Sequence, residues 1–380
     1  MSRISVIGSG FIAKGFIDLL HAHPHYQLSK ILTRTTIASR DDLPYVAFMT
    51  NSLDEVIAHS DLVVECTGDA IYACDTISQL VEAKIPVVTM NSEFHVTVGS
   101  FFVGKGVISE AEGDQPGVLA KLHEEAIAMG FTPLVYSNIK GFLNHTPTPE
   151  EMAYWSKKSG ISLPMVTSFT DGTKVQIEQT LVANGLGAGI AKEGLLGLER
   201  DTMQAGGDLL AKEAEALGYP ISDYLLSPKL PAGVFIVAKH TATQQAGLRY
   251  YKMGEGPYYV LDRTYHLCHM EIMKTVSRIL EGGGILLDNS ATPRISVATI
   301  AKRDLQEGEE IAKGIGSFAV RGIAVEITAH PNHLPIGLMH HAVMKRAVAK
   351  GEMITFDDVI LPKTLAVSVW HDICDRVLNA

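Results

Sequence analysis

The chain has 380 residues, 46% of them hydrophobic, and a formal net charge of −10 at pH 7. This length is too great for one ordinary core and predicts two or three domains. The acidic balance, without any lysine- or arginine-rich tract, argues against nucleic acid and anionic membranes as main partners. No apolar run approaches the ~20 residues of a membrane helix, and the first strand begins too early to leave room for a signal peptide, so we expect a cytoplasmic protein.

The four cysteines, Cys66, Cys74, Cys268 and Cys374, form no CxxC pair. A bridge between Cys66 and Cys74 would distort the strand and the helix predicted around them. We therefore expect four free thiols in a reducing compartment.

The first 140 residues alternate between strand-like and helix-like patterns. Short apolar runs predict strands at 4–7, 26–33, 61–66 and 86–90. Helical periodicity predicts helices at 11–22, 53–58, 73–83 and 117–129. Strands separated by helices of this length imply a parallel, doubly wound sheet, so we expect an α/β fold that begins with a Rossmann domain.

From about residue 141 the pattern indicates a second α/β domain, whose first helix opens at Pro149 or Glu150 with Thr148 as its N-cap. Strands are predicted at 166–170, 234–240 and 248–252, and helices at 174–183, 201–217 and 265–281. Three glycines, 282–284, then mark a flexible boundary. Short β-like pieces at 295–300 and 318–327 and two mutually similar segments, 301–311 and 348–359, predict a small β-rich domain.

The segment after the first strand, Gly8-Ser9-Gly10-Phe11-Ile12-Ala13, reads GxGxxA. Its first glycine permits a tight turn, its second lets a pyrophosphate approach the backbone, and the small third residue lets helix and strand pack closely. The phosphates of a dinucleotide would then lie at the helix N-terminus, near Gly10, Phe11 and Ile12. We predict binding of a nicotinamide dinucleotide; the alternative is a glycine-rich turn without a ligand. Gly15 is expected to let this helix pack closely on the sheet.

The end of the second predicted strand indicates the cofactor preference. An NAD site usually carries an acidic residue there, which holds the ribose 2′-OH. This chain has Thr33, Arg34 and Thr35, and no acidic residue before Asp41. Arginine can stack on adenine and pair with a 2′-phosphate, so we predict NADP(H). The alternative is a solvated Arg34 and an enzyme that accepts both NADP and NAD.

Two further strand ends are expected at the ligand crevice, because the carboxyl ends of parallel strands meet there. Thr67 and Gly68 are predicted to pass the pyrophosphate or the nicotinamide ribose, and Asn91 is predicted to border the nicotinamide. The alternative for each is an ordinary strand-to-loop turn.

Hydride transfer at a carbinol needs a group that gives or takes the hydroxyl proton. Lys140, at the rim of the predicted crevice, could bind an anionic substrate or act as acid or base; it could equally be a surface lysine. Lys174 and Glu178, four residues apart on one helix face, could orient a substrate hydroxyl with Asp171 at the helix N-cap, and Asn184 follows on the same helix. The alternative is a solvent-facing ion pair capped by Asp171.

A third cluster, Tyr265-His266-Leu267-Cys268-His269-Met270-Glu271, lacks the spacing of a helical zinc motif. We predict no metal site. A histidine near the cofactor is one interpretation, and two core histidines are the other.

These residues together resemble the homoserine-dehydrogenase-like oxidoreductases with a C-terminal SAF (antifreeze-like) domain, a group that includes deoxyxylulose-phosphate reductoisomerase-like enzymes. The resemblance covers nearly the whole chain. Its most specific parts are Asp171-Gly172-Thr173-Lys174 with Glu178, and the residues from Gly254-Glu255-Gly256-Pro257 through Tyr265-His266-Leu267 to Glu271. It implies a Rossmann domain at 1–140 with a returning helix at about 262–282, a catalytic domain at 141–261 and an SAF domain at 286–380.

The resemblance also limits the substrate. Homoserine dehydrogenases place a lysine just after the Thr-x-Asn strand end, where this chain has Ser92, so homoserine itself is in doubt. We expect an NADP(H)-dependent oxidoreductase that acts on the CH–OH group of a small hydroxy or keto compound: a sugar acid, a sugar phosphate or a hydroxy amino acid. Lys174 is the first candidate acid or base, with Lys140, Asp171 and Glu178 orienting the substrate.

Two alternatives remain at this point. One is a reductoisomerase, which would couple hydride transfer to a rearrangement of the carbon skeleton. The other is a metabolite sensor that binds NAD(P) without turnover. Because an apolar sheet face in the second domain often builds a dimer in this group, we also expect a homo-oligomer.

Overall fold

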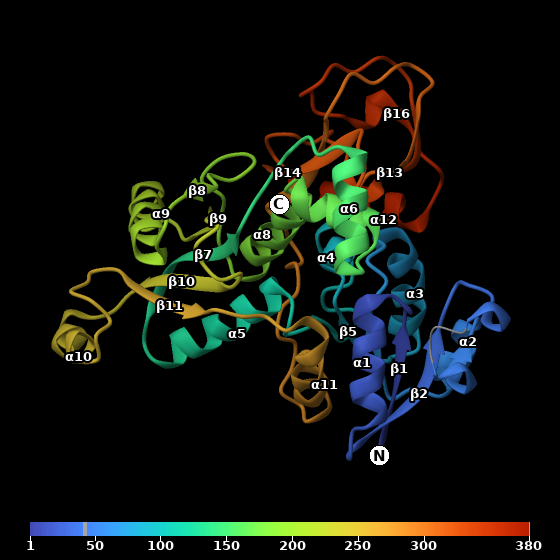
Figure 1. Ribbon diagram of the computed structural model, residues 1–380, viewed down its shortest axis with the longest axis horizontal. Coiled ribbons are helices and arrows are strands. Elements are labelled where there is room, and N and C mark those ends of the chain that lie inside the picture. Colours follow the sequence, from blue (N-terminus) through green and yellow to red (C-terminus); the bar gives the residue numbers. More distant parts are fainter. Residues whose placement is uncertain (41–43, 380) are drawn as a thin grey trace.

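The first sheet contains six parallel strands in the order β3-β2-β1-β4-β5-β6 (Figure 1). The computed structural model describes residues 1–40 and 44–379. The strands are β1 (Ser2–Ile7), β2 (Tyr26–Leu32), β3 (Met49–Thr50), β4 (Leu62–Glu65), β5 (Val87–Thr89) and β6 (Ile108–Glu110). The sequence predicts such a sheet because β4 and β5 are apolar up to their last residue and β1 is apolar at Ile4, Val6 and Ile7, as strands covered on both faces require. The expected doubly wound Rossmann sheet is confirmed.

Alternate residues of these strands enter two different cores. Ile4 and Val6 face α1 (Phe11–His21) and α11 (Ile272–Leu280), whereas Ile7 faces the opposite core. The second face is covered by α2 (Leu53–Ala58), α3 (Ala70–Glu82) and α4 (Ser92–Val98). α11 packs against the cofactor sheet through Ile272 and Val276. That helix starts at Ile272 rather than at residue 265, because residues 264–271 form a loop and a short 3-10 turn.

The second sheet is mixed and has the order β11-β10-β7-β9-β8. Its strands are β7 (Thr132–Lys140), β8 (Leu198–Glu199), β9 (Ile221–Leu226), β10 (Val234–Lys239) and β11 (Tyr259–Arg263). β7 runs parallel to β9 and antiparallel to β10. A boundary at residue 140 would assign β7 to the cofactor domain, but its strand pairing places it in this second sheet.

Helices cover both faces of the second sheet. α5 (Gln115–Ala128) and α8 (Thr173–Gly185) lie on one face, and α9 (Met203–Leu217) lies on the other. α9 approaches closely because Gly206 and Gly207 have no side chains: a Cβ at either position would collide with Leu225 or Val237. The apolar sheet face that was expected to build a dimer is therefore occupied within the chain.

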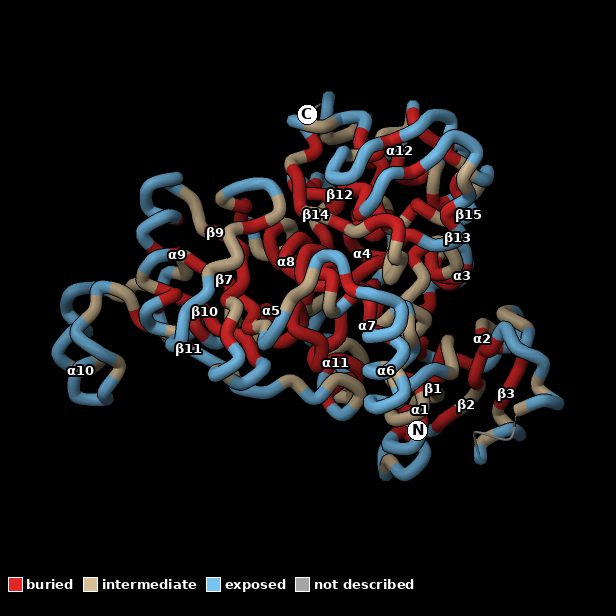
Figure 2. Tube along the Cα trace, turned by 45° about the horizontal axis from the view of Figure 1, so that its top comes forward, coloured by how far each residue is buried: buried red, intermediate tan, exposed pale blue. Residues whose placement is uncertain are grey.

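Two segments predicted as strands are helical. Residues 166–170 belong to α7 (Leu163–Thr170), which follows α6 (Pro149–Ser159). The hydroxyls of Thr167 and Ser168 donate to carbonyls one turn earlier, at 2.8 Å, so these strand-favouring residues are satisfied within a helix. Residues 248–252 lie at the end of α10 (Gln245–Tyr250), on a largely exposed arm that projects from the body of the molecule (Figure 2). Thr148 caps α6 as predicted, in a capping box with Glu151.

The C-terminal region consists of two small sheets and a final helix. β12 (Ile295–Ala301) pairs with β14 (Val320–Glu326), β13 (Glu310–Lys313) and β16 (Val359–Ile360) flank β15 (His340–Met344), and α12 (Leu365–Leu378) closes the chain. The region is more than an appendage, because Trp370 of α12 shares one core with Ile77 of α3 and Phe94 of α4.

The two similar segments of this region lie side by side in antiparallel orientation. Leu305 and Val348 exchange backbone hydrogen bonds at 2.8 and 3.1 Å. Each segment forms the same turn: Glu309 accepts the N–H of Gln306, and Glu352 accepts the N–H of Ala349, both at 3.0 Å. When the two turns are aligned in sequence, Gln306 with Ala349 and Glu309 with Glu352, Lys302 corresponds to Lys345, which lies three residues before the second segment.

All four cysteines are free thiols, as predicted. Within residues 1–40 and 44–379, no helix is both long enough and apolar enough to cross a bilayer.

Candidate active site

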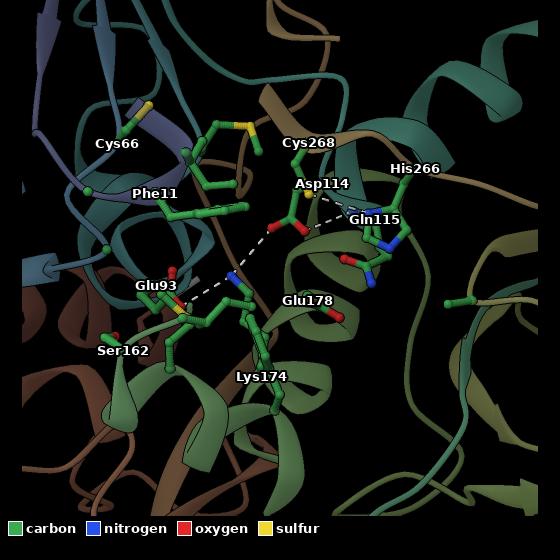
Figure 3. Close-up of a pocket in the computed structure, with 18 of the residues that line it drawn as sticks. Phe11, Cys66, Glu93, Asp114, Gln115, Ser162, Lys174, Glu178, His266 and Cys268 are labelled. Atoms are coloured by element: carbon green, nitrogen blue, oxygen red, sulfur yellow. Dashed lines mark hydrogen bonds and ion pairs between the residues drawn. The ribbon is translucent and has the colours of Figure 1, made fainter. Parts of the chain in front are cut away.

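A cavity of about 870 Å³ lies where the first sheet, α6–α7 and the second domain meet (Figure 3). Three groups of residues line it. The cofactor domain contributes Gly10, Phe11, Ile12, Cys66, Thr67, Gly68, Met90 and Glu93. The α6–α7 segment contributes Ser156, Lys157, Gly160, Ile161, Ser162, Met165 and Phe169. The remaining wall is formed by Asp114, Gln115, Ile139, Lys140, Gly141, Lys174, Glu178, Ala232, His266 and Cys268.

The GxGxxA turn has the geometry of a dinucleotide site. Gly8 has a φ of 114°, and a Cβ there would lie 3.0 Å from the carbonyl oxygen of Cys66. Gly10 is the N-cap of α1, provides no side-chain cap, and would have no atom within 4 Å of an added Cβ. The first N–H groups of α1 thus face open space beside the cavity, and this cradle fits a pyrophosphate. Ala13 is fully buried in the core, as its predicted packing role requires.

Gly15 packs differently from expectation. A Cβ at Gly15 would lie 2.5 Å from the ring of His269, so this glycine makes room for a histidine and not for the sheet. The same ring lies edge-on to Phe11. His269 is therefore a half-buried packing residue beside the dinucleotide turn.

A cluster of hydroxyls and arginines lies at the end of β2. Arg40, which the sequence analysis did not single out, donates to the hydroxyls of Ser9 at 2.7 Å, Thr35 at 3.1 Å and Thr33 at 3.3 Å. No sequence motif marks Arg40, because it lies several residues after the end of β2. Only the path of the loop brings its guanidinium back to the strand end. Asp41, the first acidic residue after β2, is outside the described residues.

Arg34 is held at the same edge. It pairs with Asp69 at 3.0 Å, and its guanidinium lies 4.6 Å from the centre of the Tyr72 ring. More than half of its side chain is exposed, so one face of the guanidinium remains open to a ligand.

The two other predicted strand ends have different roles. Thr67 and Gly68 line the cavity. Asn91 is fully buried and caps α4, accepting the N–H of Phe94 at 3.0 Å while its amide donates toward Glu65 and Thr67. It therefore orders the loop beside the cavity and does not line it.

Lys174 is the central cation of the cavity. Its ammonium donates to Ser92 at 2.7 Å and lies 3.2 Å from Glu93 and 3.4 Å from Asp114 (Figure 3). The residue is only 6% exposed, so it is not the solvent-facing lysine of the alternative interpretation. Burial by itself lowers the pKa of Lys174, but the surrounding carboxylates outweigh burial and raise that pKa well above its ordinary value. Lys174 therefore stays protonated at neutral pH.

Asp114 and Gln115 reach the cavity through the tight connection between β6 and α5. Gly113 has a φ of 124° and contacts the backbone of Cys268 so closely that a Cβ would collide with it. Asp114 then caps α5 by accepting the N–H of Gln115 at 3.1 Å. Burial alone would raise the pKa of Asp114, but the positive charges around it, Lys174 foremost, together with the Gln115 N–H outweigh burial and lower that pKa.

Glu178 joins Lys140 to the same centre. Lys140 and Asn138, two residues apart on β7, share one face of the strand and donate to the same oxygen of Glu178, at 2.9 and 2.7 Å. Lys140 is thus a half-buried wall residue and not a free surface lysine. Burial raises the pKa of Glu178, and Lys140 partly offsets that rise.

Gln115 links the two halves of the centre. With its amide oriented to satisfy its neighbours, it donates to Asp114 at 2.6 Å and to Glu178 at 3.3 Å. In the same orientation its oxygen accepts from Lys140 and from His266, both at 3.2 Å. His266 therefore belongs to the cavity wall, unlike His269. No group of three or more metal-ligating side chains occurs in the part of the chain that the structure describes.

Asp171 lies outside the cavity. It does not cap α8 as a true N-cap, since Gly172 holds that position, but its carboxylate accepts the N–H of Thr173 at 2.8 Å. Its other oxygen lies 2.6 Å from the ammonium of Lys302. Asn184 is also remote from the cavity and binds the backbone around Ile295. Neither residue can touch a substrate in this cavity.

Buried titratable groups continue behind the centre. Glu65, Thr89 and Glu110 are in register on three adjacent strands. Burial raises the pKa of Glu65 and raises that of Glu110 well above the ordinary value. His95 lies 3.5 Å from Glu110, and burial lowers its pKa to about 3. Burial thus disfavours the charged forms of this layer, whereas the centre in front of it holds the charged Lys174.

The sequence analysis missed Glu93, Asp114 and Gln115. A usable signal existed at Ser92, where the resembling dehydrogenases carry a lysine. Here Ser92 accepts a hydrogen bond from Lys174, so a lysine from another helix brings its ammonium to that point. Ser92, found in place of the lysine of those dehydrogenases, thus indicated the position that the Lys174 ammonium contacts.

Two protein families match the chain. Residues 8–96 match "Homoserine dehydrogenase, NAD binding domain", and residues 113–272 match "Oxidoreductase DRL, catalytic domain". The second match begins in the turn before α5, in agreement with the membership of α5 and β7 in the second domain. A search of curated protein sequences gave no match.

Several solved structures align with this chain at low similarity. UDP-N-acetylglucosamine 3-dehydrogenase GnnA from Acidithiobacillus ferrooxidans is 12% identical, with a TM-score of 0.42 over 76% of this chain and 92% of that one. Dihydrodipicolinate reductase from Paenisporosarcina sp. TG-14 is 12% identical, with a TM-score of 0.38 over 76% and 96%. GenD2 from gentamicin A biosynthesis, in complex with NAD, is 15% identical, with a TM-score of 0.35 over 69% and 72%. These values are too low to carry an argument about function.

The family matches agree with the site. The first covers the GxGxxA turn, and the second covers Asp114, Lys140, Lys174 and Glu178. The chain thus combines a homoserine-dehydrogenase-like NAD-binding domain with a DRL oxidoreductase catalytic domain, and it is an NAD(P)-dependent oxidoreductase.

Proposed function

We propose that the protein uses NADP(H) to interconvert a carbonyl and a CH–OH group in a small hydroxylated acid or phosphate, with Lys174 as the proton donor in the reducing direction. The observation that carries this proposal is the position of Lys174. Its ammonium lies in the wall of the cavity that begins at the dinucleotide turn, and Glu93 and Asp114 hold it.

The charge state of Lys174 suits carbonyl reduction. Bound NADPH would supply a hydride to the carbonyl carbon, and the oxygen would become an alkoxide. The ammonium can stabilise that developing charge and then donate its proton, because an alkoxide is a much stronger base than an amine. Ser92 and Glu93 keep the ammonium in place for this transfer.

The reverse direction should depend strongly on pH. Only the neutral amine of Lys174 can accept the hydroxyl proton, and the surrounding carboxylates keep that form rare at neutral pH. Below the pKa of Lys174, the neutral fraction grows about tenfold per pH unit, so alcohol oxidation should accelerate as pH rises. Oxidation that is independent of pH between about 7 and 9 would contradict Lys174 as the base.

The cavity wall supports a polyhydroxylated, anionic substrate. Its acceptors include Glu93, Asp114 and Glu178, and its donors include Lys140, Lys157 and His266. Such a mixture can bind several hydroxyls, and the lysines can attract a carboxylate or phosphate. This favours sugar acids, sugar phosphates and hydroxy amino acids over apolar ketones.

The NADP(H) preference rests on Arg34 and Arg40. Both guanidinium groups lie at the end of β2, where the 2′ position of a bound adenosine ribose is expected. Arg40 is already surrounded by three hydroxyls that a phosphate could share.

The test is a turnover screen. NADPH and NADH consumption would be followed with a panel of keto sugar acids, ketose phosphates and keto analogues of hydroxy amino acids, and the products would be analysed by mass spectrometry and NMR. We expect NADPH-dependent reduction of at least one member. Binding of NADPH without turnover on any member would instead support a metabolite sensor, and a rearranged carbon skeleton would identify a reductoisomerase.

A further inference from the structure

The C-terminal region contacts both helices that carry the charged centre. α4 bears Ser92 and Glu93, and α8 bears Lys174 and Glu178. β12 and the turn Ile336–Leu338 pack on α4, while β12 and β14 pack on α8. The contact with α4 is close, because a Cβ at Gly337 would collide with the hydroxyl of Thr97. One region thus touches the two elements that Lys174 and Glu93 join across the domain interface.

Hydrogen bonds fix the first turn of α8 to β14. The N–H of Gly322 donates to the hydroxyl of Thr173 at 3.0 Å, and the N–H of Ala324 donates to the side-chain oxygen of Gln176 at 2.8 Å. These two contacts flank Lys174 on the helix. All the donors and acceptors involved are buried, so loss of either partner would leave an unsatisfied group.

A buried ion pair completes the attachment. The ammonium of Lys302 lies 2.6 Å from Asp171, and the two side chains are 3% and 0% exposed. Lys302 also donates to the carbonyl of Ser317 at 2.5 Å, so its position is fixed within the C-terminal region. Asp171 links Lys302 to α8, because its second carboxylate oxygen accepts the N–H of Thr173 at the start of that helix.

We propose that Lys302 is a positioning residue for the reaction: through Asp171 it holds the first turn of α8 and thereby sets the distance of Lys174 from Glu93 and Asp114. This proposal rests on the proposed role of Lys174. The C-terminal region is then part of the catalytic apparatus, although none of its residues up to 379 lines the cavity.

The physical basis is the steep dependence of catalysis on position. A displacement of about 1 Å at a reacting group can cost about 100-fold in rate. Lys174 is held between two domains, so a small rotation of α8 would move it away from the α4 carboxylate. A buried ion pair is a suitable restraint, because its geometry is narrow and its loss leaves an unpaired charge.

The first test compares Lys302→Met with Arg303→Met. Arg303 is the next residue, half exposed and paired with Glu309 on the surface of the same region. Hydrogen–deuterium exchange of the peptide covering residues 171–181 should become at least tenfold faster in Lys302→Met and stay unchanged in Arg303→Met. This readout needs no substrate. Unchanged exchange in Lys302→Met would overturn the proposal.

The second test separates positioning from stability. In Asp171→Asn/Lys302→Met the asparagine oxygen can still accept the Thr173 N–H, but no charge is left unpaired. With the panel compound that wild type reduces fastest, we expect this double variant to regain thermal stability, keep the wild-type KM for NADPH and retain a kcat reduced at least tenfold. A wild-type kcat in the folded double variant would overturn the proposal.

The two proposals fail in different ways. Normal turnover in Lys174→Met would refute the role of Lys174, whereas the exchange comparison would still decide whether Lys302 restrains α8. Loss of turnover in Lys174→Met, together with wild-type kcat in the double variant, would refute only the positioning role.

Discussion

The dinucleotide turn and the charged centre border the same cavity but are built in opposite ways. The turn comes from one continuous segment, in which Gly8, Gly10 and the first residues of α1 follow β1 directly. The centre comes from four distant segments that meet at Lys174, Glu93, Asp114 and Lys140. The contrast shows that cofactor binding is a local property of this chain, whereas the chemistry depends on how its domains are packed.

The largest expected effect is at Lys174. Lys174→Met keeps the length of the side chain but removes the ammonium, so we expect kcat to fall about 10³-fold while the Kd of NADPH stays within about twofold. Steady-state kinetics and cofactor fluorescence measure the two quantities. Lys157→Met, an exposed lysine on the opposite wall, is the matched control and should lose no more than about tenfold. Comparable losses of kcat in both variants would show that Lys174 is no more important to the reaction than another lysine of the cavity wall.

A smaller effect is expected at the partner on α4. Glu93→Gln removes one of the two closest charges around Lys174 and should lower kcat by about 10- to 100-fold. It should also make the alcohol-oxidising reaction less dependent on high pH, because the pKa of Lys174 falls with fewer carboxylates nearby. The pH–rate profile provides the measurement, with Glu125→Gln on the exposed side of α5 as the control. An unshifted pH–rate profile would show that Glu93 does not influence the pKa of Lys174.

The local half of the comparison is tested at Arg40. Arg40→Met should raise the KM for NADPH about tenfold, because one charge-assisted contact to the 2′-phosphate is lost. The KM for NADH and kcat with either cofactor should remain close to wild type. Equal changes for both cofactors would indicate that Arg40 stabilises the loop and does not read the phosphate.

The smallest expected effect concerns stability and pH. Burial lowers the pKa of His95 to about 3 and that of His333 to about 4. The unfolded chain, with histidine pKa near 6.5, then binds more protons than the native state. Stability is therefore full above about pH 6.5 and falls as pH drops toward the native pKa values, by up to about 1.4 kcal/mol per pH unit for each group.

Thermal melts at several pH values test this expectation. His95→Leu removes one titrating group from the layer behind the centre and should flatten the acid limb of the Tm curve. His25→Leu, an exposed histidine near the dinucleotide domain surface, should leave that limb unchanged. If both variants retain the wild-type slope, other groups carry the loss of stability at acid pH.

The same contrast explains what the sequence could predict. The Rossmann sheet, the turn and the shared helix face of Lys174 and Glu178 follow from short-range patterns, and they were predicted correctly. The i, i+4 spacing could not reveal that Glu178 pairs with Lys140 or that Lys174 pairs with Glu93, because those contacts join residues far apart in the chain. For the same reason, the sequence led us to expect that Asp171 orients the substrate, whereas in the structure it pairs with Lys302, which is distant in sequence.

Errors in local structure had a different cause. Residues 166–170 contain Val166 and Thr167, which favour strands, but a helix forms because α7 begins with proline and buries one face against α8. The β7 boundary was missed because residues 132–140 follow a helix of the right length for a Rossmann unit. Only the strand pairing reveals that β7 joins the other sheet.

The two similar segments of the C-terminal region, 301–311 and 348–359, should differ in how well they tolerate amino-acid substitutions. Both segments form the same turn, but Lys302 is buried against Asp171, whereas Lys345 is exposed and its ammonium donates to the carbonyl of Phe356 at 3.3 Å. The first segment is thus attached to α8 through Lys302, whereas the corresponding lysine of the second lies at the surface. Libraries that randomise Lys345 and its exposed neighbours should return many active clones, and libraries at Lys302 few.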